Sequence, residues 1–453
     1  METINQINRV VLLNVSGNLN QVQLPIGLGI LINSLKLNNI PVSLIDFLPV
    51  PVNKREEYFL SRISPEPCIY GFTIIGGNNN LKEVEKYAQR LLQINPKSII
   101  VYGGPLPSSA PETLLRKCSC QYIVRGEGEV SFPKLVKSIF EGNYYPEDIS
   151  GVYYLKEGNF IGKKNEMIRK LDQYSKVDYS LFDMEFYIAY LNETGQSFEI
   201  MASKGCPYNC YFCFKSGGTG MSTKTASAVL DEIEHIRKTY NMNRFYFVDE
   251  NFFAAKSFFK DFIEEKQKRG LEFTFIIQAR IDSFDREMLQ LAKDHGLVGM
   301  STAIEAVSQE ELDRIKKNIQ FSHIESQLNL MKEVGVQVWA DFIIGFPGDT
   351  IEGYKQIIKF VRKHKLEKRF KLSYLTPLPG TQLWEEAVQK GLIKDEFEYI
   401  HSMGDLFFER MANLTRFTDE VLDHYYNEIA SIGRRPVDYP KHQRYLSQIR
   451  EIH

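Results

Sequence analysis

The chain has 453 residues, which is enough for two or three domains that each bury a hydrophobic core. Hydrophobic residues make up 43% of the chain and charged residues 25%, both ordinary values for a globular protein. A formal net charge of −2 argues against a nucleic-acid-binding protein that relies on a broad basic surface.

The N-terminal residues lack the pattern of a secretory signal peptide, which is a cationic segment followed by an apolar run and a small-residue cleavage site. The longest apolar stretch nearby, Leu24 to Leu37, is interrupted by proline, glycine and asparagine, so we expect it not to span a bilayer. We therefore expect a cytoplasmic protein that binds neither a membrane nor nucleic acid.

Short apolar strands alternate with helical patterns in the first part of the chain. Strands that are apolar along their whole length and joined by helices predict a parallel sheet with helices on both faces. Glycine-rich turns follow several of these strands, at the edge where open α/β sheets bind ligands. We therefore predict a doubly wound α/β domain over residues 1–141. Its expected strands lie at 9–15, 42–47, 68–75, 98–104 and 122–129, with helices at 25–39 and 81–94.

A second α/β series follows a less regular stretch, residues 142–195, which we predict to be a linker with a small hairpin around 151–162. Six strand–helix units then predict a partial (β/α)6 barrel over residues 196–394, with an active site at the carboxyl ends of its strands. We expect residues 395–453 to form a mostly helical cap over the barrel mouth. The expected barrel strands lie at 198–203, 244–249, 273–280, 297–305, 336–345 and 369–377.

Three of the six cysteines, Cys206, Cys210 and Cys213, stand close together with the spacing C-x3-C-x2-C. In a reducing cytosol such a group binds metal or acts in catalysis rather than forming disulfides. Three thiolates leave one iron of a four-iron cluster without a protein ligand, and an open metal position is what a reactive site requires. The alternative, a zinc site, needs a fourth Cys or His at finger-like spacing, and the next histidine, His235, lies in a predicted amphipathic helix.

This spacing, with Phe212 just before the last cysteine, resembles the signature of the radical S-adenosylmethionine (SAM) superfamily. The resemblance implies a [4Fe–4S] cluster on the three cysteines. It also implies that the amino and carboxylate groups of SAM chelate the unique iron, and that an electron from the cluster cleaves SAM to a 5′-deoxyadenosyl radical. One departure is Lys204, which stands where relatives often carry arginine.

The resemblance extends through the expected barrel. The segment DFIIGFPGDT (341–350) resembles the adenine-packing motif of the fifth strand, RFYFVDENF (244–252) resembles a second-strand segment, and YLTPLPGTQLW (374–384) resembles the sixth. Arg280 and Glu305, at the ends of the third and fourth strands, are expected to contact the methionyl or ribose groups, or else to form ion pairs at the barrel rim. The SAM-binding residues implied are Phe212, Asp249, Asn251, Arg280, Glu305, Ile343, Gly345 and Pro347.

The first domain, placed ahead of this barrel, resembles the Rossmann-like cobalamin-binding domain of B12-dependent radical enzymes. The first histidine of the chain is His235, so residues 1–234 contain no histidine. The D-x-H-x-x-G loop of methionine-synthase-like domains is therefore absent from this domain. We therefore expect base-off cobalamin without a histidine ligand from this domain. The cobalamin-binding residues implied are Leu24, Gly27, Thr73, Gly103, Gly104, Pro105, Gly126, Glu127 and Gly128.

The resemblance implies a methyltransferase that methylates an unactivated carbon with methylcobalamin and a 5′-deoxyadenosyl radical. Ring contraction or oxidative cyclisation with the same cofactors stays an open alternative. So do a radical enzyme whose N-terminal domain binds no cobalamin and a non-enzymatic metal-binding sensor. We expect a small-molecule or peptide substrate and an external electron donor of the flavodoxin or ferredoxin type.

Overall fold

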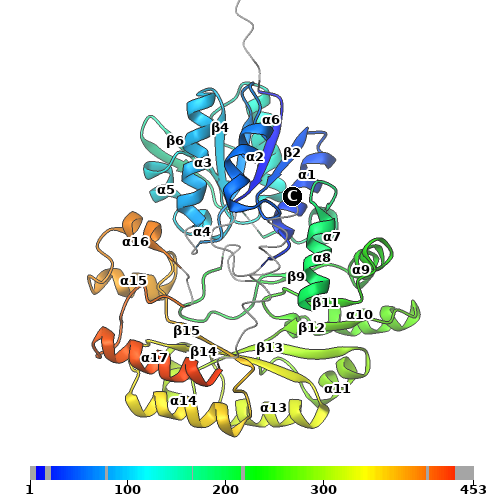
Figure 1. Ribbon diagram of the computed structural model, residues 1–453, viewed down its shortest axis with the longest axis vertical. Helices are drawn as coiled ribbons and strands as arrows, with labels where there is room; N and C mark the ends of the chain where they lie inside the picture. Colours follow the sequence, from blue (N-terminus) through cyan, green and yellow to red (C-terminus); the bar gives the residue numbers. More distant parts are fainter. Residues whose placement is uncertain are drawn as a thin grey trace, which may run out of the picture.

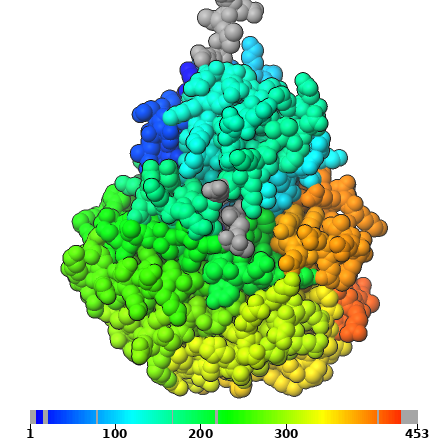
Figure 2. Space-filling view, turned by 180° about the vertical axis from the view of Figure 1, so that it is seen from behind, coloured from blue at the N-terminus to red at the C-terminus, as the bar shows by residue number. Residues whose placement is uncertain are grey.

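The structure is a computed structural model that describes residues 7–15, 22–76, 80–165, 167–215, 220–404 and 408–433. Two sheets follow one another along the chain, and the N-terminal sheet with its helices is stacked on the second (Figure 1). Seen from behind, the two bodies form a continuous surface with α15 and α16 bridging them at one side (Figure 2). Among the described residues, no helix is long and apolar enough to cross a membrane.

The N-terminal sheet has seven strands in the order β2-β1-β3-β4-β5-β6-β7, and β1 to β5 are parallel. This order reverses direction between β1 and β3, which is the point where doubly wound sheets bind ligands. The predicted doubly wound sheet is therefore confirmed. The strands are β1 (Val10–Asn14), β2 (Val42–Asp46), β3 (Ile69–Thr73), β4 (Ile99–Gly103), β5 (Tyr122–Val124), β6 (Val152–Lys156) and β7 (Asn159–Gly162).

Helices cover both faces of this sheet, which explains why strands such as β1 are buried along their whole length. On one face α1 and α6 contact each other. On the other face α2 and α3 meet through Phe59 and Tyr87, whose ring centroids are 4.9 Å apart. The helices of this domain are α1 (Ile26–Leu37), α2 (Arg55–Arg62), α3 (Asn80–Ile94), α4 (Pro105–Ser109), α5 (Pro111–Lys117) and α6 (Gly128–Phe140).

The hairpin expected in the linker, β6–β7, pairs antiparallel with β5 and extends the N-terminal sheet. The sheet therefore continues past residue 141. Two helices follow, α7 (Leu171–Tyr174) and α8 (Met184–Thr194). Tyr187 of α8 donates a 2.8 Å hydrogen bond to Asp46 at the end of β2, so this connecting segment packs on the first domain.

The second sheet has six parallel strands in the order β15-β14-β13-β12-β11-β8, so consecutive strands are neighbours, as the predicted partial barrel requires. In β14, fully buried residues alternate with partly buried ones, because one face packs on helices and the other faces the barrel interior. The strands are β8 (Phe198–Ile200), β11 (Arg244–Phe247), β12 (Thr274–Gln278), β13 (Leu297–Glu305), β14 (Gln337–Ile344) and β15 (Phe370–Tyr374).

Helices join these strands along the outside of the barrel (Figure 1). A short antiparallel ribbon, β9 (Ser203–Lys204) with β10 (Ser222–Thr223), leaves the sheet at its upper edge. The helices are α9 (Ala226–Tyr240), α10 (Lys256–Lys268), α11 (Arg286–Asp294), α12 (Gln309–Arg314), α13 (Phe321–Val334), α14 (Ile351–Lys363) and α15 (Gln382–Gln389).

The C-terminal segment differs from the expected cap. Helix α17 (Asp419–Gly433) lies along the outer face of the barrel, where it contacts α14 and β15. The ring of Tyr426 stacks on that of Tyr374 with centroids 4.0 Å apart, and this apolar contact, together with buried Leu422, holds the helix there. Helix α16 (Glu396–Ser402) instead contacts α5 of the first domain. The rest of the expected cap, 405–407 and 434–453, lies outside the described residues.

Candidate active site

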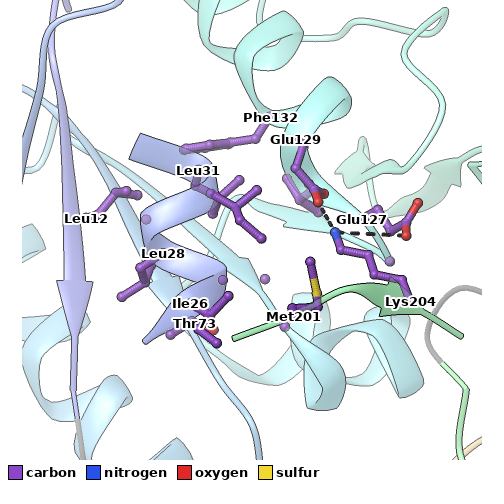
Figure 3. A pocket seen from close by; sticks show the side chains of 18 of the residues that line it. Leu12, Ile26, Leu28, Leu31, Thr73, Glu127, Glu129, Phe132, Met201 and Lys204 are labelled. Carbon is purple, nitrogen blue, oxygen red and sulfur yellow. Dashed lines mark hydrogen bonds and ion pairs between the residues drawn. The ribbon is translucent and has the colours of Figure 1, made fainter. Parts of the chain in front are cut away.

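A cavity of about 400 Å³ lies between the two sheets, at the carboxyl edge of the N-terminal one (Figure 3). Leu28 and Leu31 of α1 and Phe132 of α6 line one side of the cavity. The barrel contributes Met201 and residues 203–205. The wall is therefore shared between the two domains. Two rows of paired strand residues form the floor: Leu12, Gly71 and Val101 in one, and Thr73, Gly103 and Val124 in the other.

Two glycines in the floor give the cavity its depth. A β-carbon added at Gly71 would stand 2.8 Å from Leu12 Cδ2 and 3.3 Å from Phe132 Cζ, so a side chain there would crowd the slot. A β-carbon at Gly103 would meet only the Val124 carbonyl oxygen, at 3.6 Å. A side chain larger than alanine at Gly103 would therefore extend into open space. The sheet therefore carries no side chain at these two positions of the floor, which leaves room for a ligand.

The rim of the cavity is built from two glycine turns tied together by one serine. The Ser108 hydroxyl donates to the Gly104 carbonyl oxygen at 2.7 Å and accepts from the Gly126 amide at 2.8 Å. Gly104 has φ 100°, and a β-carbon there would stand 2.8 Å from the Ile74 carbonyl oxygen, so a larger residue is excluded. The turns after β4 and β5 are thus fixed relative to each other.

Most of the residues predicted to bind cobalamin meet at this cavity. Leu24 does not line it, since it is buried beside β8 and its amide donates to Glu199 at 3.2 Å. Pro105 starts α4 behind the rim. The roles of all nine in cobalamin binding stay a prediction. The seven that line the cavity are Gly27, Thr73, Gly103, Gly104, Gly126, Glu127 and Gly128.

Asp249, just after β11, anchors the segment that leads into the cysteines. Its carboxylate accepts a 3.1 Å hydrogen bond from the Ala202 amide and another from the Ser203 hydroxyl. Burial raises the pKa of Asp249 to about 6. Both carboxylate oxygens therefore contact the segment that leads into the cysteine loop, and the contact of Asp249 with SAM stays a prediction.

The cysteine loop begins with a tight turn at Gly205, where φ is 83° and a β-carbon would stand 2.4 Å from the Gly220 carbonyl oxygen. Cys206 and Cys210 are partly buried, Cys213 is exposed, and all three are free thiols. Burial raises the pKa of the Cys206 thiol. Among the described residues, no three Cys, His, Asp or Glu side chains converge on a single metal ion, whereas an iron–sulfur cluster takes each thiolate on a different iron.

Arg280, after β12, supports the cysteine loop from the barrel side. Its Nη1 donates to Cys210 Sγ at 3.7 Å, and its guanidinium lies 3.8 Å from the centroid of the Tyr208 ring. Nε and Nη2 donate to the Asp282 carboxylate at 2.9 Å each, and Nη2 also donates to the Lys317 carbonyl oxygen at 2.7 Å. The side chain is 7% exposed, so these protein groups enclose it. Arg280 therefore holds Cys210 in place.

Glu305 and Asn251 lie at the same rim. Glu305, with φ 70° at a register irregularity of β13, pairs with the Lys317 ammonium at 3.3 Å. Arg280 and Glu305 therefore both form local ion pairs at the barrel rim, which was the alternative to a contact with SAM. Asn251 accepts from the Arg280 amide at 3.2 Å, while its buried Nδ2 has no partner among the described residues. That unpaired donor is available to a bound ligand.

The turn after β14 meets the cysteine loop through Phe212, whose ring lies edge-on to that of Phe346 with centroids 6.3 Å apart. Asp349 fixes this turn by accepting from the Gly345 amide at 2.7 Å and the Phe346 amide at 3.0 Å. Ile343 is partly buried on β14 and Pro347 follows Phe346. The structure thus gathers Phe212 and the expected adenine motif in one place, and their contacts with SAM stay a prediction.

The sequence did not predict the charged wall between the two domains. Lys204 and Lys215 of the cysteine segment line the cavity together with Glu127 and Glu129. Lys215 Nζ donates to the Cys206 carbonyl oxygen at 3.0 Å. The sequence indicated these residues only weakly. Lys204 stands where relatives often carry arginine, and Glu129 is the last residue of the segment GEGE (126–129), but neither observation predicts that the two side chains pair.

Comparison with known proteins agrees with this geometry. Residues 14–136 match the family model of the B12 binding domain, and residues 200–361 match that of the radical SAM superfamily. The chain belongs to the cobalamin-dependent radical SAM enzymes. In this family, the two domains imply a [4Fe–4S] cluster, SAM and cobalamin as cofactors.

Individual relatives carry more than one activity in their names. An uncharacterized methyltransferase of Pyrococcus horikoshii is 29% identical over 72% of this chain and 71% of its own length. An anaerobic magnesium-protoporphyrin IX monomethyl ester cyclase of Rubrivivax gelatinosus is 26% identical over 78% of this chain and 66% of its own. The same fold occurs in the radical SAM methyltransferase TsrM of Kitasatospora setae, with a TM-score of 0.70 at 18% identity over 85% of this chain and 75% of TsrM.

Proposed function

We propose that this cobalamin-dependent radical SAM enzyme is a methyltransferase that transfers a methyl group to an unactivated carbon of a small molecule or peptide. One observation carries the proposal: a single cavity is lined both by the glycine edge of the N-terminal sheet and by Ser203, Lys204 and Gly205, which lead into the cysteines. A cavity shared in this way lets two cofactors act on one substrate.

For the cluster site, we infer that Cys206, Cys210 and Cys213 ligate a [4Fe–4S] cluster and leave one iron open to SAM. Arg280 keeps Cys210 in position, and Asp249 holds the segment before Cys206. Asn251 offers its unpaired amide, and Phe212 with the turn at Gly345 forms an apolar wall. When bound, the cluster and SAM supply a carbon-centred radical, and cobalamin supplies a methyl group.

For the cobalamin site, we infer that the tail of the cofactor enters the slot above Gly71 and Gly103, beside the rim at Gly104 and Gly126. Because residues 1–234 contain no histidine, no imidazole of this domain is available beneath the cobalt. A nucleotide tail held in this slot would keep its dimethylbenzimidazole away from the cobalt, so the cofactor would bind base-off. Leu28, Leu31 and Phe132 make the slot apolar and exclude water from it.

The test uses anaerobic chain reconstituted with iron, sulfide and cobalamin, a chemical reductant or a flavodoxin, and SAM carrying a labelled methyl group. We expect about four irons per chain, as a [4Fe–4S] cluster requires, together with bound cobalamin and 5′-deoxyadenosine. The label is expected to move to cobalamin. C206A is expected to lose the cluster and 5′-deoxyadenosine, whereas C120A, a buried cysteine of the other domain, keeps both. Absence of bound cobalamin from the wild type would contradict the proposal.

Cyclisation is the second candidate, because a relative that matches 78% of this chain is named as a cyclase. The two activities share the cavity and the cluster, so they separate only at the product. A substrate that gains a labelled methyl group supports methyl transfer. A substrate that forms a new ring without gaining label supports cyclisation instead.

A further inference from the structure

We propose that Lys204 is a positioning residue that fixes the cysteine loop against the cobalamin-side domain through an ion pair across the domain interface. The inference rests on the proposed function, because it takes the loop as the cluster site and the cavity as the cobalamin site. It adds a device that sets the relative placement of the two sites.

Lys204 occupies a strand that is held from both sides. Ser203 and Lys204 form β9, and successive strand residues point in opposite directions. The Ser203 hydroxyl donates to Asp249 in the barrel, whereas the Lys204 side chain extends toward the N-terminal domain (Figure 3). The turn at Gly205 follows at once and leads to Cys206. Any movement of Lys204 is therefore passed to the first cysteine of the loop.

Two carboxylates of the other domain receive the Lys204 ammonium. Nζ forms an ion pair with Glu129, in the first turn of α6, and lies 4.0 Å from Glu127 Oε1, in the turn after β5 (Figure 3). The Glu129 side chain is 4% exposed, that of Glu127 9% and that of Lys204 19%. A carboxylate buried to this degree needs a cation or several donors.

The two carboxylates are themselves fixed, so the lysine docks on a rigid frame. The Glu129 carboxylate also accepts from the Ser175 hydroxyl at 3.3 Å, and its backbone oxygen accepts from the Ser34 hydroxyl of α1. The Glu127 carboxylate accepts from the Ile168 amide at 2.5 Å. Lys204 therefore connects the cysteine segment to α1, α6 and the connecting segment at one point.

Because Lys204 lies beside the cysteine loop, we expect loss of its ion pair to slow the reaction more than it destabilises the fold. A misplacement of about 1 Å between reacting groups is able to cost about 100-fold in rate. Lys204 is two residues from Cys206 and lines the same cavity as Gly103 and Gly126. Loss of the tether would let the loop and the cavity adopt several relative placements without unfolding either domain.

The experiment compares wild type, K204M, the double variant K204M/E129Q and the control R410M. Arg410 is 21% exposed, close to the 19% of Lys204, and pairs with Asp419 and Asp423, which are 52% and 41% exposed. R410M therefore removes a cation of similar exposure from an ion pair that does not line the cavity. Two readouts are used. Hydrogen–deuterium exchange of residues 203–213 needs no cofactor, and magnetic coupling between the reduced cluster and Co(II), measured by EPR on the reconstituted chain, reports the relative placement of the two sites.

We expect K204M and K204M/E129Q to exchange faster at residues 203–213 and to show weaker, broader coupling than wild type. Methyl transfer from SAM to reduced cobalamin is expected to slow by about tenfold or more. The melting temperature falls in K204M and recovers in part in the double variant, because E129Q removes the more buried of the two carboxylates that lose their cation. R410M lowers the melting temperature alone.

Two results overturn the proposal. Unchanged exchange and coupling in K204M would show that Lys204 positions nothing, and coupling that recovers with stability in the double variant would assign it a purely structural role. A wild-type chain that binds cluster but no cobalamin contradicts the proposed function instead. In that case the exchange data alone decide whether Lys204 docks the loop.

Discussion

The two sheets build their ligand-facing edges in opposite ways. The N-terminal sheet omits side chains, so that Gly71, Gly103, Gly104 and Gly126 leave a slot with a glycine rim. The barrel instead has buried charged groups at its edge. One of them, Arg280, contacts Cys210, Asp282 and Lys317 at the same time.

The N-terminal domain must therefore keep open space at its ligand-facing edge, and the barrel must keep its charged groups paired at its own edge. A slot is lost when a methyl group is added, even if the fold is unaffected. A charged rim is lost when one partner is removed, because the other charge then stays buried without compensation. Variants that change volume on one side and charge on the other therefore test the comparison directly.

The largest effect on cofactor binding is expected from filling the slot. In G103V the new side chain extends into the cavity, because only the Val124 carbonyl oxygen lies near that position. Overpacking of this kind costs about 1–3 kcal/mol, so cobalamin affinity should fall by about 10- to 100-fold. Anaerobic titration with cobalamin, followed by its absorption spectrum, measures the loss.

The control for G103V is I100V, which changes a buried residue of the same strand that does not line the cavity. It is expected to keep cobalamin affinity while losing a little stability, about 0.5–1.5 kcal/mol. If G103V also bound cobalamin as wild type does, the slot would not be the cofactor site.

On the barrel side, R280M removes the buried guanidinium and leaves Asp282 without its partner. Breaking a buried pair costs about 3–5 kcal/mol, so we expect a lower melting temperature and less iron retained on Cys210 after desalting. R280K keeps the charge but loses the bidentate hydrogen bond to Asp282. Its melting temperature and iron content should lie between those of wild type and R280M.

The control for Arg280 is R269M. Arg269 is an 18% exposed residue in a network with Asp231, Glu234 and Glu265 on the outer helices. It should lose stability and retain iron. Equal iron loss in both variants would mean that Arg280 contributes only to folding.

Much of this arrangement was predictable from local sequence. Apolar strands and their spacing determine both parallel sheets, and the C-x3-C-x2-C motif determines the cysteine loop. Glycine turns indicated the rim, because glycine is the residue that tolerates φ near 100° as at Gly104.

Contacts between distant segments were not predictable in the same way. The pair of Lys204 with Glu129 joins residues 75 positions apart, and its formation depends on how the two domains dock. The position of α17 depends on the stacking of Tyr374 with Tyr426 on the outer face of the barrel. No single-segment pattern contains either contact, so charge and aromatic content alone did not reveal them.

A smaller effect on stability than that of R280M is expected at Glu199, which lies on β8 where the two domains meet and accepts the Leu24 amide at 3.2 Å. Burial raises the pKa of Glu199 to about 7 from its ordinary value of 4.5. The folded protein therefore holds this proton more tightly than the unfolded chain, and the resulting stability is full below pH 4.5 and lost as the pH rises through 7.

E199Q stays neutral and still accepts from Leu24, so it should match wild type near pH 4 and be more stable above pH 8 by about 3 kcal/mol. Melting temperatures across this range measure the difference, with E310Q as the control because the Glu310 side chain is 84% exposed. If the wild type gained stability relative to E199Q as the pH rose, the carboxylate would be paired rather than buried. The contact between β8 and the N-terminal domain would then depend on charge, as the Lys204–Glu129 pair does, and not on burial of a neutral carboxyl group.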